Sequence, residues 1–201
     1  MRDEGWLKHA SARVYLTRRA DESWQMLKYG RFKASELTDA YVSAAVFGSA
    51  RNAWLADRKG GYKVADNIIR RIDTVIDLDY SDEIKRNHVI KSLQDMGLGR
   101  DMHMIKTGRG WHIWCLSAWE LFIKRGMPEV HGRNAHIIKA QRRLCTLLKR
   151  RGCVFDTMAA IGVKRIFRLK DSRHGKTGAI CSEIPIPDLR NQEPLWRAQA
   201  R

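Results

Sequence analysis

The segment Val75-Ile76-Asp77-Leu78-Asp79-Tyr80 constrains the fold more than any other part of the chain. Its side chains alternate in the period-2 pattern of a β-strand, which places Asp77 and Asp79 on one face and the apolar residues on the other. Their Cα atoms are then roughly 6 to 7 Å apart, so both carboxylates can converge on divalent ions about 3.5 to 4 Å apart. Magnesium and manganese prefer such oxygen ligands. The alternative is a strand end with two ordinary solvated aspartates.

The charge of the chain indicates an anionic partner. Its 38 Lys and Arg against 22 Asp and Glu give a formal net charge of +16. The excess is concentrated between Arg142 and Lys176, where eleven cationic residues face only Asp156 and Asp171. Nucleic acid or a nucleoside triphosphate fits this footprint best.

Length and composition favour one globular domain over residues 1–201. The hydrophobic fraction is 44% and the charged fraction is 30%, which argues against disorder. The motifs described below span about 70–185, and the Pro-containing tail over 185–201 is expected to be extended.

Nothing in the sequence predicts secretion or membrane insertion. The first residues, Met1 to Trp6, carry acids and no apolar core, and no later run approaches the ~18 apolar residues of a membrane span. We therefore expect a cytoplasmic protein with no membrane partner, associated with a nucleoid or encoded on a mobile element. The four cysteines are widely spaced, so we expect free thiols and no structural zinc.

Local patterns predict the elements around the acidic strand. A cap at Ser35 predicts a helix that passes toward a strand by Phe47, and Gly60-Gly61 predicts a turn. A second helix should begin at Ser81-Asp82-Glu83. A third should run from an Asn134 N-cap to Arg151, with Gly152 as its end. Strands are expected over 102–106, 111–116, 164–169 and 178–184.

Two further segments carry groups suited to phosphate binding. Thr107-Gly108-Arg109-Gly110-Trp111-His112 combines glycines, which let backbone amides approach a ligand, with a guanidinium and an imidazole. The second segment, 172–178, contains Gly-Lys-Thr but lacks the earlier glycine of a P-loop. It is expected to form a tight loop that presents His174 and Lys176, after a strand that carries Arg165 and Arg168.

In order along the chain, these elements resemble the archaeo-eukaryotic primase superfamily, and within it the small catalytic subunit of archaeal and eukaryotic replicative primases. The matching elements are the hydrophobic Asp-x-Asp strand, the Thr-Gly-Arg-Gly-aromatic-His segment, and Asp156 followed by Arg165 to Gly178. The resemblance implies an α/β (α+β) catalytic core, in which a mixed or antiparallel sheet with an RRM-like unit is flanked by helices. One departure is Lys170-Asp171, where the family usually carries Pro-Gly.

The resemblance also implies roles for particular residues. The catalytic and metal-binding carboxylates would be Asp77, Asp79 and Asp156, holding two Mg²⁺ or Mn²⁺ ions. The nucleotide-binding residues would be Thr107, Arg109, His112, Arg165, Arg168, Ser172, His174 and Lys176. The implied function is that of a DNA primase catalytic subunit, which makes short primers on single-stranded DNA from nucleoside triphosphates. A primase large subunit is a further candidate partner.

Three alternatives remain open at this point. The first is a primase-polymerase or end-joining polymerase that extends ends with deoxynucleotides. The second is a nucleic-acid-binding accessory subunit without catalysis. The third is a glycosyltransferase that uses the Asp-x-Asp pair with a nucleotide sugar, although such an enzyme has no use for so cationic a surface.

Overall fold

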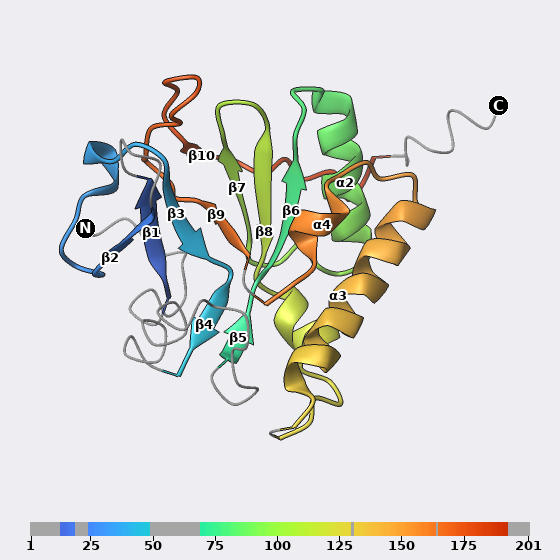
Figure 1. The fold of residues 1–201 in the computed structure, drawn as a ribbon. Coiled ribbons are helices and arrows are strands. Elements are labelled where there is room, and N and C mark those ends of the chain that lie inside the picture. Colours follow the sequence, from blue (N-terminus) through green and yellow to red (C-terminus); the bar gives the residue numbers. More distant parts are fainter. Residues whose placement is uncertain (1–12, 19–23, 49–68, 130, 164, 193–201) are drawn as a thin grey trace.

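The computed structural model describes residues 13–18, 24–48, 69–129, 131–163 and 165–192 (Figure 1). The turn expected at Gly60-Gly61 and the tail from residue 193 onward lie outside the described residues. In the described part, three layers follow one another in Figure 1: a first sheet, a second sheet and a group of helices. No helix among these residues is long and apolar enough to cross a membrane.

Within the described residues, ten strands form two four-stranded sheets and one two-stranded ribbon. The first sheet has the order β2-β1-β3-β9, the second has the order β10-β7-β8-β6, and β4 pairs with β5. Every ladder between these strands is antiparallel. The strands are β1 (Tyr15–Arg18), β2 (Trp24–Leu27), β3 (Ala40–Ser43), β4 (Ala45–Phe47), β5 (Ile69–Ile72), β6 (Thr74–Leu78), β7 (Met102–Lys106), β8 (Trp111–Cys115), β9 (Ile166–Arg168) and β10 (Ser182–Ile184). The predicted α+β class with an antiparallel sheet is confirmed.

The helices are α2 (Glu83–Asp95), α3 (Arg133–Arg150) and α4 (Thr157–Ala160), with a 3-10 turn η2 (Ala34–Glu36) and a π-helical turn η3 (Trp119–Ile123). As expected, α2 begins after Asp82, whose carboxylate accepts a hydrogen bond from the Lys85 amide at 3.0 Å. The start predicted for α3 is wrong by two residues. Its N-cap is Gly132, at φ 81°, and Asn134 lies inside the first turn.

The prediction of a helix that begins at Ser35 is wrong. Only the 3-10 turn η2 forms there, and β3 and β4 follow it. The chain cannot continue as a helix because Asp39 adopts φ 50°, in the left-handed region. Beyond it, aromatic and β-branched residues such as Tyr41 and Val42 favour a strand, and the chain pairs with β1 and β9.

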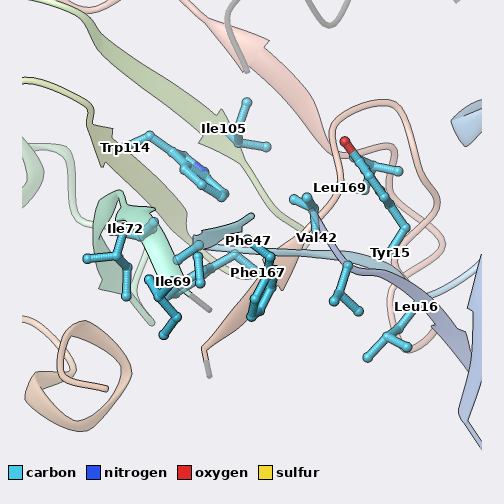
Figure 2. Packing of buried hydrophobic residues seen from close by; sticks show 14 of the residues in the cluster. Tyr15, Leu16, Val42, Phe47, Ile69, Ile72, Ile105, Trp114, Phe167 and Leu169 are labelled. Atoms are coloured by element: carbon cyan, nitrogen blue, oxygen red, sulfur yellow. The ribbon is translucent and has the colours of Figure 1, made fainter. Parts of the chain in front are cut away.

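Alternation along β8 builds two hydrophobic clusters on the two sides of the second sheet. Trp111 and Ile113 pack with residues of α2 and α3. Trp114 points the other way, where its ring meets Phe167 of β9 with centroids 5.7 Å apart. Figure 2 shows Trp114, Ile105 and Phe167 in this inter-sheet cluster. The contact fixes the first sheet against the second, so polar residues on these facing surfaces have set positions.

All four cysteines are buried and free, as expected.

Candidate active site

The acidic strand and a distant loop bring three carboxylates together. Asp77 lies on β6, Asp79 follows its end, and Asp156 pairs with Asp77 in an isolated antiparallel bridge. In this bridge the Asp156 amide donates to the Asp77 carbonyl oxygen at 2.9 Å. One carboxylate oxygen from each residue lies within 4.8 Å of the others. The backbone pairing at the β6 edge therefore adds a third acid to the pair that alternation places on one face.

Asp156 also organises its own neighbourhood. One carboxylate oxygen caps α4 by accepting from the amides of Met158, at 2.7 Å, and Ala159, at 3.2 Å. These bonds fix the side chain with its charge beside Asp77. The sequence does not predict this capping role for Asp156, because α4 has only four residues and no amphipathic pattern.

The donor set fits a pair of hard divalent ions. Two oxygens bound to the same Mg²⁺ lie at most about 4.2 Å apart, and ligands shared by two ions about 3.5 to 4 Å apart spread further. A separation of 4.8 Å is compatible with such a site. Burial, together with the charges of Asp79 and Asp156, raises the pKa of Asp77 to about 7. Bound cations would offset both effects, so the residues present suit Mg²⁺ or Mn²⁺.

His112 lies opposite Asp77 in the β6–β8 register, and its Nε2 is 3.5 Å from an Asp77 carboxylate oxygen. Burial, with the positive charge of Arg168 adding to it, lowers the pKa of His112 to about 3. The ring is therefore neutral, and its contact with Asp77 is no ion pair. The ring packs edge-on against Phe167, with centroids 5.3 Å apart. Its Nδ1 is buried without a hydrogen-bond partner in the described part of the chain.

The two predicted phosphate-binding segments are in direct contact. A Cβ atom added at Gly108 would lie 2.1 Å from Thr177 Oγ1 and 2.7 Å from His174 Cγ. Only glycine allows the loop over 107–110 to approach the loop over 172–178 so closely. The structure thus brings Arg109 and Lys176, both exposed, onto adjacent loops.

Backbone amides inside the second loop fix the orientation of His174. Its Nδ1 accepts from the amides of Lys176, at 3.2 Å, and Thr177, at 3.3 Å. The ring proton is accordingly assigned to Nε2. Burial and the Arg168 charge lower the pKa of His174, although Asp39 opposes the shift. The ring is therefore a neutral donor at Nε2.

Asp39 is a site residue that sequence reasoning missed. Its carboxylate pairs with the Arg168 guanidinium and accepts from the Gly175 amide at 2.9 Å. Burial alone would raise the pKa of Asp39, but these bonds and the Arg168 charge hold it below its usual value. A Cβ at Gly175 would lie 2.0 Å from the Asp39 carboxylate. Arg168 also stacks over the Tyr41 ring, 5.0 Å from its centroid.

Three of the predicted nucleotide-binding residues form local hydrogen bonds. The Ser172 hydroxyl is buried and donates to the Leu169 carbonyl oxygen at 2.7 Å. The Thr107 hydroxyl accepts from the Gly110 amide at 3.1 Å, which closes its own turn. Arg165 Nε donates to the Ile161 carbonyl oxygen at 3.0 Å. Their roles at a nucleotide stay predictions.

The departure at Lys170-Asp171 has a conformational counterpart. Asp171 adopts φ 67°, a left-handed conformation that glycine enters freely and aspartate tolerates. Its amide donates to the Cys181 carbonyl oxygen. The loop therefore turns over the site without the Pro-Gly pair.

Comparison with known proteins gives a structural likeness alone. No protein-family model matches the chain, and no curated protein matches it. Among solved structures, the AEP domain of the primase-polymerase from cyanophage S-2L is similar, with a TM-score of 0.50 and 14% identity. The match covers 90% of this chain and 84% of that one. The chain therefore shares the fold of an archaeo-eukaryotic primase domain.

Proposed function

We propose that this protein is a metal-dependent nucleotidyltransferase that synthesises primers on a single-stranded DNA template. The observation that carries the proposal is the convergence of Asp77, Asp79 and Asp156 within 4.8 Å on a fold shared with a primase-polymerase domain. Two loops rich in cations and backbone amides lie next to this carboxylate triad. A site with both parts can bind metal ions and a triphosphate together.

Each side has a distinct task in the proposed reaction. Asp77, Asp79 and Asp156 hold two divalent ions, which when bound lower the pKa of an attacking 3′-hydroxyl and neutralise phosphate charge. Arg109 and Lys176 are exposed and supply positive charge to the triphosphate. His174 Nε2–H donates a hydrogen bond to a phosphate oxygen, because backbone amides already donate to its Nδ1.

The neutral state of His112 and His174 suits this arrangement. Arg168 lies close enough to lower the pKa of both rings. Neutral rings add hydrogen-bonding capacity without adding charge beside the metal ligands. Arg168 itself is oriented by Asp39 before any nucleotide binds, which reduces the ordering needed on binding.

A second candidate activity is extension with deoxynucleotides, as in a primase-polymerase. The likeness to the cyanophage primase-polymerase domain favours it over a replicative primase subunit that makes RNA. The proposal does not extend to a primase large subunit, because no surface among the described residues singles out that partner.

The test is primer synthesis from labelled ATP or dATP on single-stranded DNA, with Mg²⁺ or Mn²⁺ and no primer supplied. The wild-type chain should form labelled oligonucleotides, and Asp77→Ala should form none. Preference for dATP would assign the primase-polymerase activity, and preference for ATP the RNA primase. Absence of product from the wild-type chain under every condition, with a preformed primer also tested, would favour the non-catalytic accessory alternative.

A further inference from the structure

Helix α3 carries an exposed row of cations that the proposed chemistry does not use. The buried residues of α3 recur at helical spacing. Its apolar stripe packs into the core and includes Ile137, Leu144 and Leu148. The cations on the opposite side are all exposed, and we call them the α3 cationic face: Lys139, Arg142, Arg143, Lys149 and Arg150.

No carboxylate of the described residues neutralises the positive charges of the α3 cationic face. None of its five residues forms an ion pair with a carboxylate in the described part of the chain, and α3 itself contains no Asp or Glu. Lys139 and Arg143 are four residues apart, a spacing at which like charges destabilise a helix. The helix dipole favours Lys149 and Arg150 in the last turn, but it gives no support to the three cations before them. An external polyanion would remove this repulsion.

The face leads toward the carboxylate triad. It extends about 16 Å along the helix from Lys139 to Arg150, at 1.5 Å per residue. Asp156 is only six positions after Arg150 (156 − 150), so their Cα atoms are at most about 22 Å apart. In Figure 1, α4, which follows Asp156, lies between β6 and α3.

Contacts on the buried side of α3 fix the position of the helix that carries the α3 cationic face. The Gln141 side chain, which is buried, accepts from the Gly162 amide at 2.8 Å, in the turn before β9. At the other end, His88 Nε2 bonds the Arg151 carbonyl oxygen at 2.6 Å. The helix is therefore fixed to the turn before β9 and, just past its C-terminal end, to α2.

Exposed apolar side chains flank the triad residue Asp156 in the sequence. Val154 is 56% exposed and Met158 is 68% exposed, on either side of Asp156 in the sequence. Exposed apolar groups beside cations suit bases and sugars, which inorganic polyphosphate lacks. A membrane surface fits poorly, because binding there requires an exposed apolar helix face, and the apolar stripe of α3 is buried.

From these observations we propose that the α3 cationic face binds the phosphate backbone of single-stranded DNA that leads to the carboxylate triad. The inference deepens the proposed function, on which it rests for the direction of the strand. Binding by this face requires neither metal nor nucleotide, and it can be measured without them.

The test compares two variants of the full chain that each lose three positive charges. The first is K139Q/R142Q/R143Q on α3. The matched control is R31Q/R100Q/R125Q, at exposed positions in turns outside α3. Both reduce the net charge from +16 to +13 (16 − 3). Glutamine has a helix propensity close to that of lysine and arginine, so the helix should persist, and circular dichroism checks this.

Binding is measured by fluorescence anisotropy of a single-stranded oligonucleotide over a series of salt concentrations, without metal or nucleotide. The α3 variant should bind at least about tenfold more weakly at low salt. Its slope of log K against log salt should fall by about 2, at roughly 0.7 for each phosphate that the variant no longer neutralises. The control should change less than about twofold. Equal losses of affinity in the two variants would overturn the proposal.

Three further arms separate the alternatives. R142K/R143K keeps the charge and should keep binding, whereas weaker binding by this variant would indicate a structural role and contradict the proposal. Polyglutamate and anionic phospholipid vesicles should bind more weakly than the oligonucleotide, and stronger binding to either through α3 would overturn it. Asp77→Ala should retain oligonucleotide binding. If the wild-type chain binds the oligonucleotide through α3 but makes no product, the proposed function is refuted and the proposal for the α3 cationic face still holds.

Discussion

On the acidic side of the site, three carboxylates lie within 4.8 Å of one another and none pairs with a cationic side chain of the described residues. On the basic side, Arg168 already has a carboxylate partner in Asp39, which also holds the Gly175 amide. The acidic side therefore stays electrostatically unbalanced until cations arrive. The basic side is ordered in advance by its own contacts.

This contrast predicts different consequences of mutation on the two sides. Removal of a carboxylate charge from the acidic side, with the side-chain shape kept, should abolish the binding of an ion without harming the fold. Removal of the Asp39 carboxylate from the basic side should keep the same number of cationic residues. Arg168 and the loop at Gly175 would lose the partner that fixes their positions.

The largest effect is expected at Asp156, where the ligand and the helix cap can be separated. Asp156→Asn keeps a side chain that caps α4 as well as aspartate does, but removes the ligand charge. Nucleotide incorporation should fall by at least about a hundredfold, beyond the 10- to 100-fold typical of outer-shell partners of a metal. The free energy of unfolding should stay within about 0.5 kcal/mol of wild type.

Asp156→Ala provides the comparison, since it loses both the ligand and the cap. Its free energy of unfolding in urea should fall by about 1 kcal/mol more than that of Asp156→Asn. If Asp156→Asn incorporated nucleotide at the wild-type rate, Asp156 would be a helix cap alone.

A smaller effect is expected at Asp39, which acts through its partners. Asp39→Asn weakens the bonds to the Arg168 guanidinium and the Gly175 amide. Hydrogen bonds to charged groups contribute about 1.5 to 3 kcal/mol, so KM for the nucleotide should rise by about tenfold or more. Steady-state kinetics should show little change in kcat, because the triad is untouched.

The exposed Asp188, which pairs with Arg190, serves as the control for Asp39. Asp188→Asn should leave KM unchanged. A lower KM in Asp39→Asn would mean that Asp39 competes with the triphosphate for Arg168, and it would contradict a positioning role.

The smallest effect is expected at Asp171, which lets the basic loop turn at φ 67°. Asp171→Gly should not lower the free energy of unfolding, because glycine adopts this conformation readily. Asp171→Ala should lower it by about 1 kcal/mol, since alanine is strained there. Urea unfolding of the two variants measures the difference. Equal stabilities would show that the left-handed turn is not maintained in solution.

The acidic side was more accessible to sequence reasoning than the basic side. Alternation in the segment 75–80 is local, and it placed Asp77 and Asp79 on one face as the structure has them. Asp156 was assigned only through the family resemblance. The bridge that joins it to Asp77 is a pairing across 79 positions (156 − 77), and no local pattern encodes such a contact.

The sequence does not identify Asp39 as a site residue, because its partners are far away in the chain. Arg168 is 129 positions later, and the two meet through pairing of β3 with β9. The cap pattern at Ser35 predicts a helix through this segment, whereas Asp39 adopts a left-handed conformation just before β3. By contrast, Asp82 before α2 and Gly152 after α3 are local signals, and both predicted the helix ends correctly.

The central claim is that the carboxylate triad binds divalent ions, and direct Mn²⁺ binding tests it best. Electron paramagnetic resonance can count the Mn²⁺ bound to the full chain in the presence of a non-hydrolysable nucleoside triphosphate. Wild type should bind two ions, and Asp77→Asn should lose at least one of them while it remains folded. Identical Mn²⁺ binding by wild type and Asp77→Asn would contradict the claim.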